Sequence, residues 1–286
     1  MIPQPDRSEV LDRSDPDRQF AIAIARAFGG AIIFGLPLMM TMEMWQLGSA
    51  MPSARLALLI TIWIPLLVGL SAVAGFEQTL RLKHDALDAF VAIAVGTVAA
   101  TAILVLLGVL DSDVGFHEAV AMITLQALPG SMGALLASSQ FGSREATGHR
   151  DGSGRRDTWG GEIFLMGVGA NFLAFNVAPT EEIALLGLEM GPWHTVATVI
   201  VSLLLMHGFV YAVEFSGQAS IPPGTPLVSV FVRYTVVGYV VVLALSTFML
   251  WCFNRLAGLS IAEGLSLVIA LGLPGAIGAA AARLIL

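Results

Sequence analysis

The amino-acid sequence predicts an all-α polytopic membrane protein of about eight transmembrane helices, arranged as two parallel-related four-helix repeats. Three observations lead to this prediction. The composition is 56% hydrophobic and only 12% charged, which is about half the charged fraction of a typical soluble domain. Eight apolar windows of roughly 20 residues follow one another along the chain. Segments of the second half also resemble segments of the first at nearly constant spacing.

Each apolar window is long enough to cross the hydrocarbon core of a bilayer as a helix. Backbone polar groups in lipid must be satisfied within a helix or within a closed barrel. The windows are too long and too continuously apolar for barrel strands of about 10 alternating residues. The expected spans are 22–45, 56–76, 88–110, 116–138, 162–182, 195–215, 227–251 and 261–284.

Polar stretches divide the chain into parts. Residues 1–20 form a polar, acidic tail without an apolar core, so we expect no cleaved signal peptide. Residues 139–160 form a polar, glycine-rich linker. It separates a first membrane repeat, 21–138, from a second, 161–286.

The distribution of positive charge predicts the orientation. Basic residues gather before the first span, after the second and after the fourth, whereas the opposite loops offer only Arg55 and Arg255. Loops rich in Lys and Arg remain in the cytoplasm, so both termini and the linker should be cytoplasmic. The basic residues on this side are Arg7, Arg13, Arg18, Arg81, Lys83, Arg144, Arg150, Arg155 and Arg156.

Two pairs of segments carry the internal repeat. Residues 30–48 and 169–187 align without a gap, and residues 128–137 and 273–282 share six of ten positions. Each half contains an even number of spans, so both halves should enter the membrane the same way up. A two-fold axis along the membrane normal would then relate them. In the second pair, small residues three apart favour close helix packing over a gate.

The first pair of segments places acidic residues at matching points. Carboxylates suit hard cations and protons, and charge inside a membrane is costly. Glutamates at helix ends can alternatively just reach interfacial water. The adjoining Pro37 and Pro179 predict either a local helix break, with carbonyl oxygens as extra ligands, or a simple kink. The predicted cation-binding or proton-coupling residues, at the outer side, are Glu43, Glu181, Glu182, Glu118, Glu263, Thr41 and Thr180.

A second group of polar residues lies within the spans or at their inner ends. A histidine there could titrate, but it is more often an interhelical hydrogen-bond partner. The sequence leaves the identity of any bound metal open. These pathway or inner-side candidates are Glu77, Glu214, Asn171, Asn176, Gln126 and His207.

Several chemistries have no signature in this sequence. It contains no Walker A loop, dinucleotide fingerprint, His-x-x-x-His pair or G-x-S-x-G motif. The single Cys252 excludes an internal disulfide, and no basic cluster is large enough for nucleic acid. We therefore expect no enzyme, no cofactor and no nucleic-acid partner. The expected partners are the lipid bilayer and a cation, and the sequence leaves a homo-oligomer open.

The runs TMEMW, at 41–45, and APTEE, at 178–182, resemble those of a bacterial family of integral membrane proteins of unknown function. The similarity covers nearly the whole chain. It implies a multi-pass protein of the bacterial inner membrane and says nothing about a substrate.

Two alternative functions follow from the residues. The first is a cation channel or proton-coupled cation transporter that uses paired glutamates between the repeats. The alternative is a non-transporting scaffold or sensor that binds a protein or lipid partner through residues 139–160.

Overall fold

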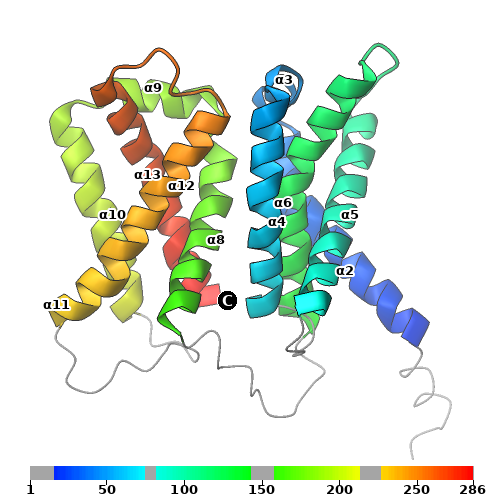
Figure 1. Cartoon of the computed structure of the whole chain (residues 1–286), viewed down its shortest axis with the longest axis horizontal. Coiled ribbons are helices and arrows are strands. Elements are labelled where there is room, and N and C mark those ends of the chain that lie inside the picture. The colour runs from blue at the N-terminus through cyan, green and yellow to red at the C-terminus, as the bar shows by residue number, and fades with distance from the viewer. Residues whose placement is uncertain (1–15, 75–81, 143–157, 213–226, 286) are drawn as a thin grey trace, which may run out of the picture.

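The computed structural model describes residues 16–74, 82–142, 158–212 and 227–285, and all regular secondary structure in these ranges is helical. The helices form two groups that stand side by side (Figure 1). We call residues 16–142 the first half and residues 158–285 the second half.

The first half is built around one central helix. It comprises α2 (Pro16–Met39), the short α3 (Met42–Ala50), α4 (Ser53–Ala74), α5 (Leu82–Leu106) and α6 (Phe116–Gly142). The most buried of these is α6, which packs against the other four. Gly96 of α5 permits one of these contacts, because a side chain there would collide with the α6 backbone at Ala127 and Ser131.

The second half repeats this order of elements around α13. It comprises α8 (Trp159–Val177), the short α9 (Glu181–Glu189), α10 (Pro192–Ala212), α11 (Leu227–Val230), the π-helical turn η1 (Phe231–Val236), α12 (Val237–Cys252) and α13 (Ile261–Ile285). Here α13 packs against α8, α9, α10 and α12, as α6 does in the first half.

The predicted spans correspond to the long helices. By length and composition, seven described helices can cross a membrane, and an eighth span arises if α9 and α10, bent by 116°, count as one. The predicted windows 22–45 and 162–182 were too long at their ends, because α2 ends at Met39 and α8 at Val177. A separate short helix follows each of them.

Threonines produce these two helix ends. The backbone N–H and the hydroxyl of Thr41 both donate to the Leu38 carbonyl, at 3.0 and 2.8 Å. Thr180 does the same to the Val177 carbonyl, at 3.1 and 3.0 Å. Both threonines have extended backbone angles and occupy the N-cap position of the following short helix. The prolines therefore accompany a true break and not a kink. The threonines thus donate to one carbonyl at each break, that of Leu38 or Val177, and cation binding by the other carbonyls there stays a prediction.

Residues paired by the sequence alignment make paired contacts in the two halves. A side chain on Gly30 would collide with the Gly133 backbone, and one on Gly169 would collide with the Gly278 backbone. Gly48 likewise faces Met122, as Gly187 faces Leu267. The small residues thus let helix backbones approach closely, which confirms their predicted packing role. Descent of the halves from one duplicated module remains a prediction.

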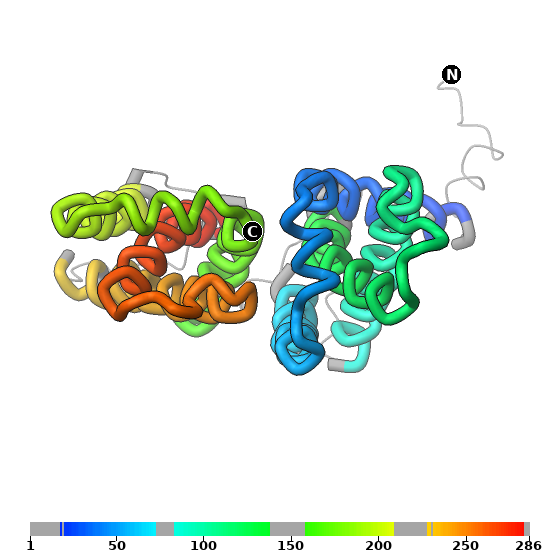
Figure 2. Tube along the Cα trace, turned by 90° about the horizontal axis from the view of Figure 1, so that it is seen from above, coloured from blue at the N-terminus to red at the C-terminus, as the bar shows by residue number. Residues whose placement is uncertain are grey.

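The halves stand the same way up but do not meet through equivalent surfaces. In Figure 1, α3 and α9 both lie at the top. The main contacts between the halves join α4 to α8 and α12, and α6 to α8. The helix equivalent to α4 is α10, which lies at the far edge of the second half (Figures 1 and 2). A two-fold axis between the halves would have placed α4 and α10 equivalently, so that prediction was wrong.

Candidate functional site

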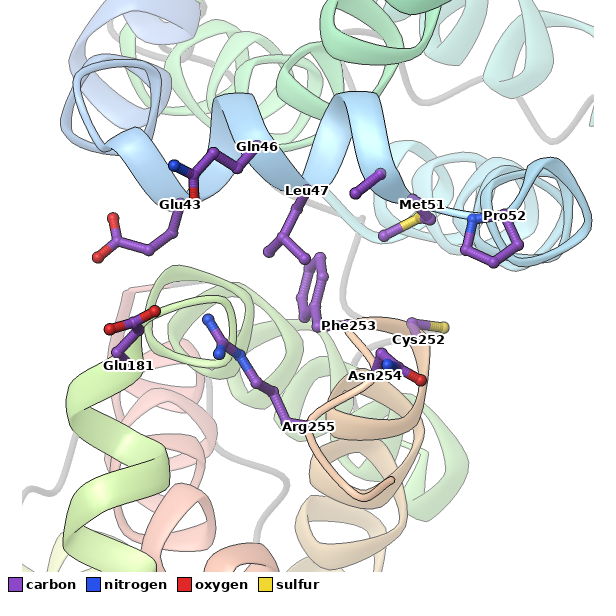
Figure 3. Close-up of a pocket in the computed structure, with 11 residues that line it drawn as sticks. Glu43, Gln46, Leu47, Met51, Pro52, Glu181, Cys252, Phe253, Asn254 and Arg255 are labelled. Carbon is purple, nitrogen blue, oxygen red and sulfur yellow. The ribbon is translucent and has the colours of Figure 1, made fainter. Parts of the chain in front are cut away.

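A cavity of about 390 Å³ opens where the two halves meet, on the side of α3 and α9. Its walls are α3 and the following turn from the first half, and the start of α9 and the end of α12 from the second (Figure 3). We call it the boundary pocket. Its lining residues are Glu43, Gln46, Leu47, Ala50, Met51, Pro52, Glu181, Cys252, Phe253, Asn254 and Arg255.

Two carboxylates stand at one end of the boundary pocket. Glu43 is the second residue of α3 and is half-buried, whereas Glu181 is the first residue of α9 and is exposed. Figure 3 shows them on opposite walls. An acid in the first turn of a helix is stabilised by the helix dipole, by about 0.3–1 kcal/mol. The helix breaks therefore explain why both short helices begin with acids, and the boundary places one from each half at a shared cavity.

Arg255 brings a positive charge to the same pocket. It follows α12, and its side chain extends toward Glu181 in Figure 3. Its terminal Nη2 donates to the Pro179 carbonyl, between α8 and α9, where a cation suits the negative end of the α8 dipole. The Nε atom is buried and has no hydrogen-bond partner. Within the described part of the chain, neither Glu43 nor Glu181 forms an ion pair with this guanidinium.

A second arginine links the halves next to the pocket. Nη1 of Arg55, on α4, donates to Oδ1 of Asn254 at 2.8 Å, and the guanidinium lies 5.0 Å from the centre of the Trp251 ring. Asn254 has a φ of 60°, a conformation that asparagine adopts more readily than most residues. This contact holds the turn that carries Arg255.

Aromatic rings close the pocket toward the protein interior. Phe253 lines the pocket, and its ring centre lies 5.4 Å from that of Phe175, which in turn lies 5.1 Å from that of Trp63. All three side chains are at most 2% exposed. The Trp63 indole donates to the Ser131 hydroxyl at 3.3 Å. We call Trp63, Phe175 and Phe253 the aromatic plug, because these buried rings contact one another in series across the boundary between the halves.

The whole-chain comparison gives the family. Residues 23–286 match the family model described as "Putative integral membrane protein (DUF2391)". The chain belongs to this family. The resemblance seen in the TMEMW and APTEE runs is thereby confirmed, and with it the membrane assignment. No curated protein and no solved structure matched the chain.

The five outer glutamates predicted for this DUF2391 protein do not converge in one site. Only Glu43 and Glu181 line the boundary pocket, whereas the other three lie elsewhere. Glu182, the sequence counterpart of Glu43, is exposed. Glu118 is half-buried in the first turn of α6. Across the described ranges, no group of three or more His, Cys, Asp or Glu side chains could hold a metal ion.

Glu263 has a structural role at the start of α13. The Ser260 backbone N–H donates to its Oε2 at 2.7 Å, and the Glu263 N–H donates to the Ser260 hydroxyl at 3.3 Å. This reciprocal pair is a capping box, which satisfies backbone donors that a helix start leaves unpaired. The equivalence of Glu263 with Glu118 in the sequence alignment therefore reflects two helix starts.

The candidates inside the spans are partly explained by local contacts. His207 Nδ1 lies 3.1 Å from the Thr235 hydroxyl in η1, so its expected interhelical hydrogen bond is confirmed. The Asn176 amide donates to the Phe172 carbonyl of its own helix at 2.7 Å.

Asn171 is buried, with its amide 3.9 Å from the Met132 sulfur across the boundary. Gln126 is fully buried, and neither its amide nitrogen nor its oxygen has a partner. Glu77 and Glu214 lie outside the described residues.

Sequence reasoning missed Arg255 as a site residue. It counted this arginine only as one of two positive charges in the outer loops. The sequence did hold a usable signal. Arg255 lies in the loop between α12 and α13, whereas the corresponding loop of the first half, between α5 and α6, has no arginine. Phe253 and Asn254 had no comparable signal, because only the meeting of α12 with α4 gives them a place in the pocket.

Proposed function

We propose that this protein is a proton-coupled carrier whose binding site, the boundary pocket, holds a cation or the cationic group of a larger substrate. One observation supports the proposal above the others: Glu43 and Glu181, from different halves, line the same cavity. With Arg255, they give the pocket two negative charges and one positive charge. The net negative charge favours a cation or the cationic group of a larger ligand.

A carrier fits the boundary between the halves better than an open channel does. The aromatic plug of Trp63, Phe175 and Phe253 packs behind the Phe253 wall of the pocket, and its rings are at most 2% exposed. A substrate can then pass the plug only if the halves move relative to one another, as in transporters built from paired repeats. The glutamates can exchange a proton for the cation, because carboxylates bind both. The prediction of a channel is therefore narrowed to a proton-coupled carrier.

The proposed orientation puts the pocket on the outer side of a bacterial inner membrane, with both termini in the cytoplasm. Its support is the distribution of Arg and Lys. In agreement with this, α2 starts and α13 ends on the side away from α3 and α9 (Figure 1). The alternative scaffold function rests on residues 139–160, of which 143–157 lie outside the described residues, and it stays a prediction.

Flux through reconstituted liposomes tests the carrier proposal. Liposomes loaded with a pH-sensitive dye would report proton movement after addition of Na⁺, Ca²⁺ or the amino acid L-leucine. Combining Glu43→Gln with Glu181→Gln should abolish the proton movement that wild-type protein gives. Glu182→Gln is the matched control, since it removes an exposed acid of the same helix turn that does not line the pocket. Unchanged proton movement in the double variant would refute the proposal.

A further inference from the structure

We infer that the ligand of the boundary pocket is a zwitterion: a small molecule that carries both an ammonium and a carboxylate, together with an apolar side chain. This inference rests on the proposed function and names the class of its substrate. The ammonium would lie between Glu43 and Glu181, and the carboxylate would accept a hydrogen bond from Arg255 Nη1.

The state of Arg255 is the first step of the argument. Its Nη2 is occupied by the Pro179 carbonyl, which fixes the guanidinium beside the pocket. Its Nε is buried and therefore out of reach of a ligand. The other terminal nitrogen, Nη1, is neither buried nor hydrogen-bonded, and neither pocket glutamate takes this donor. An acceptor supplied by a ligand would bind Nη1 and leave the bond to Pro179 intact.

A bare metal cation would fit this set of charges poorly. The described residues provide two pocket carboxylates and no cluster of three metal-binding side chains. A metal ion would also stand near the fixed charge of Arg255 and would leave its Nη1 without an acceptor. A zwitterion satisfies both signs of charge at once, because its ammonium meets the carboxylates and its carboxylate meets the guanidinium.

The remaining walls suggest the rest of the ligand. Leu47, Met51 and Phe253 give the cavity an apolar side, while Gln46 and Asn254 add neutral polar groups. The volume of about 390 Å³ exceeds what an inorganic ion needs and lies at the small end of organic-ligand pockets, roughly 300–1,000 Å³. An apolar amino acid combines these properties, so L-leucine is a suitable probe.

Binding of three matched probes to the wild-type protein tests the inference. L-Leucine carries both charges, 3-methylbutylamine lacks the carboxylate, and 4-methylpentanoate lacks the ammonium. Isothermal titration calorimetry of the full chain in detergent should show leucine binding about 10- to 100-fold more tightly than either analogue, because each analogue leaves one charged wall of the pocket without its partner. Equal affinity for leucine and 3-methylbutylamine would overturn the role of Arg255.

Two variants assign the two ends of the ligand. Arg255→Lys keeps the positive charge but loses the planar fork, which can donate to Pro179 and to a ligand at the same time. It should weaken leucine binding about tenfold or more and leave 3-methylbutylamine binding unchanged. Glu43→Gln combined with Glu181→Gln should weaken both ligands. If Na⁺ or Ca²⁺ binds in a Glu43- and Glu181-dependent manner and leucine does not, the zwitterion inference fails while the carrier proposal stands. If none of the probes binds in that manner, both fail.

Discussion

The two helix breaks, α2–α3 and α8–α9, share one design but end in different caps. Each has a threonine that returns two hydrogen bonds to the helix before it, and each has an acid in the first turn of the short helix. In the first half, the Trp45 indole donates to the Met39 carbonyl at 2.7 Å. In the second half, Arg255, 76 residues away in sequence, donates to the Pro179 carbonyl.

This difference between the two caps shows where the charge of the two halves differs. The local cap of the first break is neutral and closes within six residues of sequence. The long-range cap of the second break brings a charge to the boundary pocket. The shared features follow from the need to end and restart a helix, whereas the differing caps determine the charges available to a ligand.

The largest effect should come from filling the close helix contacts common to both halves. Gly30→Leu and Gly169→Leu each drive a side chain into a neighbouring helix backbone. Overpacking typically costs about 1–3 kcal/mol and more against a rigid backbone, so both variants should aggregate or melt well below wild type. Size-exclusion chromatography and thermal unfolding in detergent measure this. Gly29→Leu is the control, because nothing lies within 4 Å of its would-be Cβ. If Gly169→Leu unfolded at the wild-type temperature while Gly30→Leu was destabilised, the two helix contacts would not be equivalent.

The next effect concerns the two caps. Arg255→Gln removes a charged donor from the Pro179 carbonyl, and Trp45→Phe removes a neutral donor from the Met39 carbonyl. Hydrogen bonds from charged groups are worth about 1.5–3 kcal/mol and neutral ones about 0.5–1.5 kcal/mol. Solvent screens the half-buried charge of Arg255. We therefore expect Arg255→Gln to lower the free energy of unfolding by an amount near the lower end of the charged range, and Trp45→Phe by an amount within the neutral range. Only Arg255→Gln should also impair ligand binding. A loss of binding in Trp45→Phe would contradict the proposed division of roles.

The smallest effect should come from the threonine hydroxyls. Thr41→Val and Thr180→Val each remove one hydrogen bond to a carbonyl that still accepts from the backbone N–H. We expect each to lower stability by about 0.5–1 kcal/mol, equally in the two halves. Thermal unfolding of the two variants side by side makes the comparison. A several-fold difference between them would show that the breaks are not alike.

The sequence predicted those features that lipid and backbone chemistry dictate. Long apolar windows predict spanning helices because the bilayer leaves few other solutions. Pro37 and Pro179 predicted a break or a kink at both places where a helix ends, although the predicted spans continued through them. The alignment pairs Glu43 with Glu182, and the prediction named the adjacent Glu181 beside it; Glu181 is the one that lines the boundary pocket with Glu43. Neighbouring residues differ by about 100° around a helix, and the direction of α9 depends on a boundary that the repeat does not predict. The place of Arg255 depends in the same way on tertiary contact.

A double-mutant cycle on Glu43 and Glu181 tests most directly the claim that the two halves share one site. Ligand affinity would be measured by calorimetry for the wild type, Glu43→Gln, Glu181→Gln and the double variant. Two carboxylates around one ammonium act together, so the losses should be non-additive, with a coupling of about 0.5–3 kcal/mol. Losses that add, or a single variant that binds like wild type, would contradict a site shared between the halves.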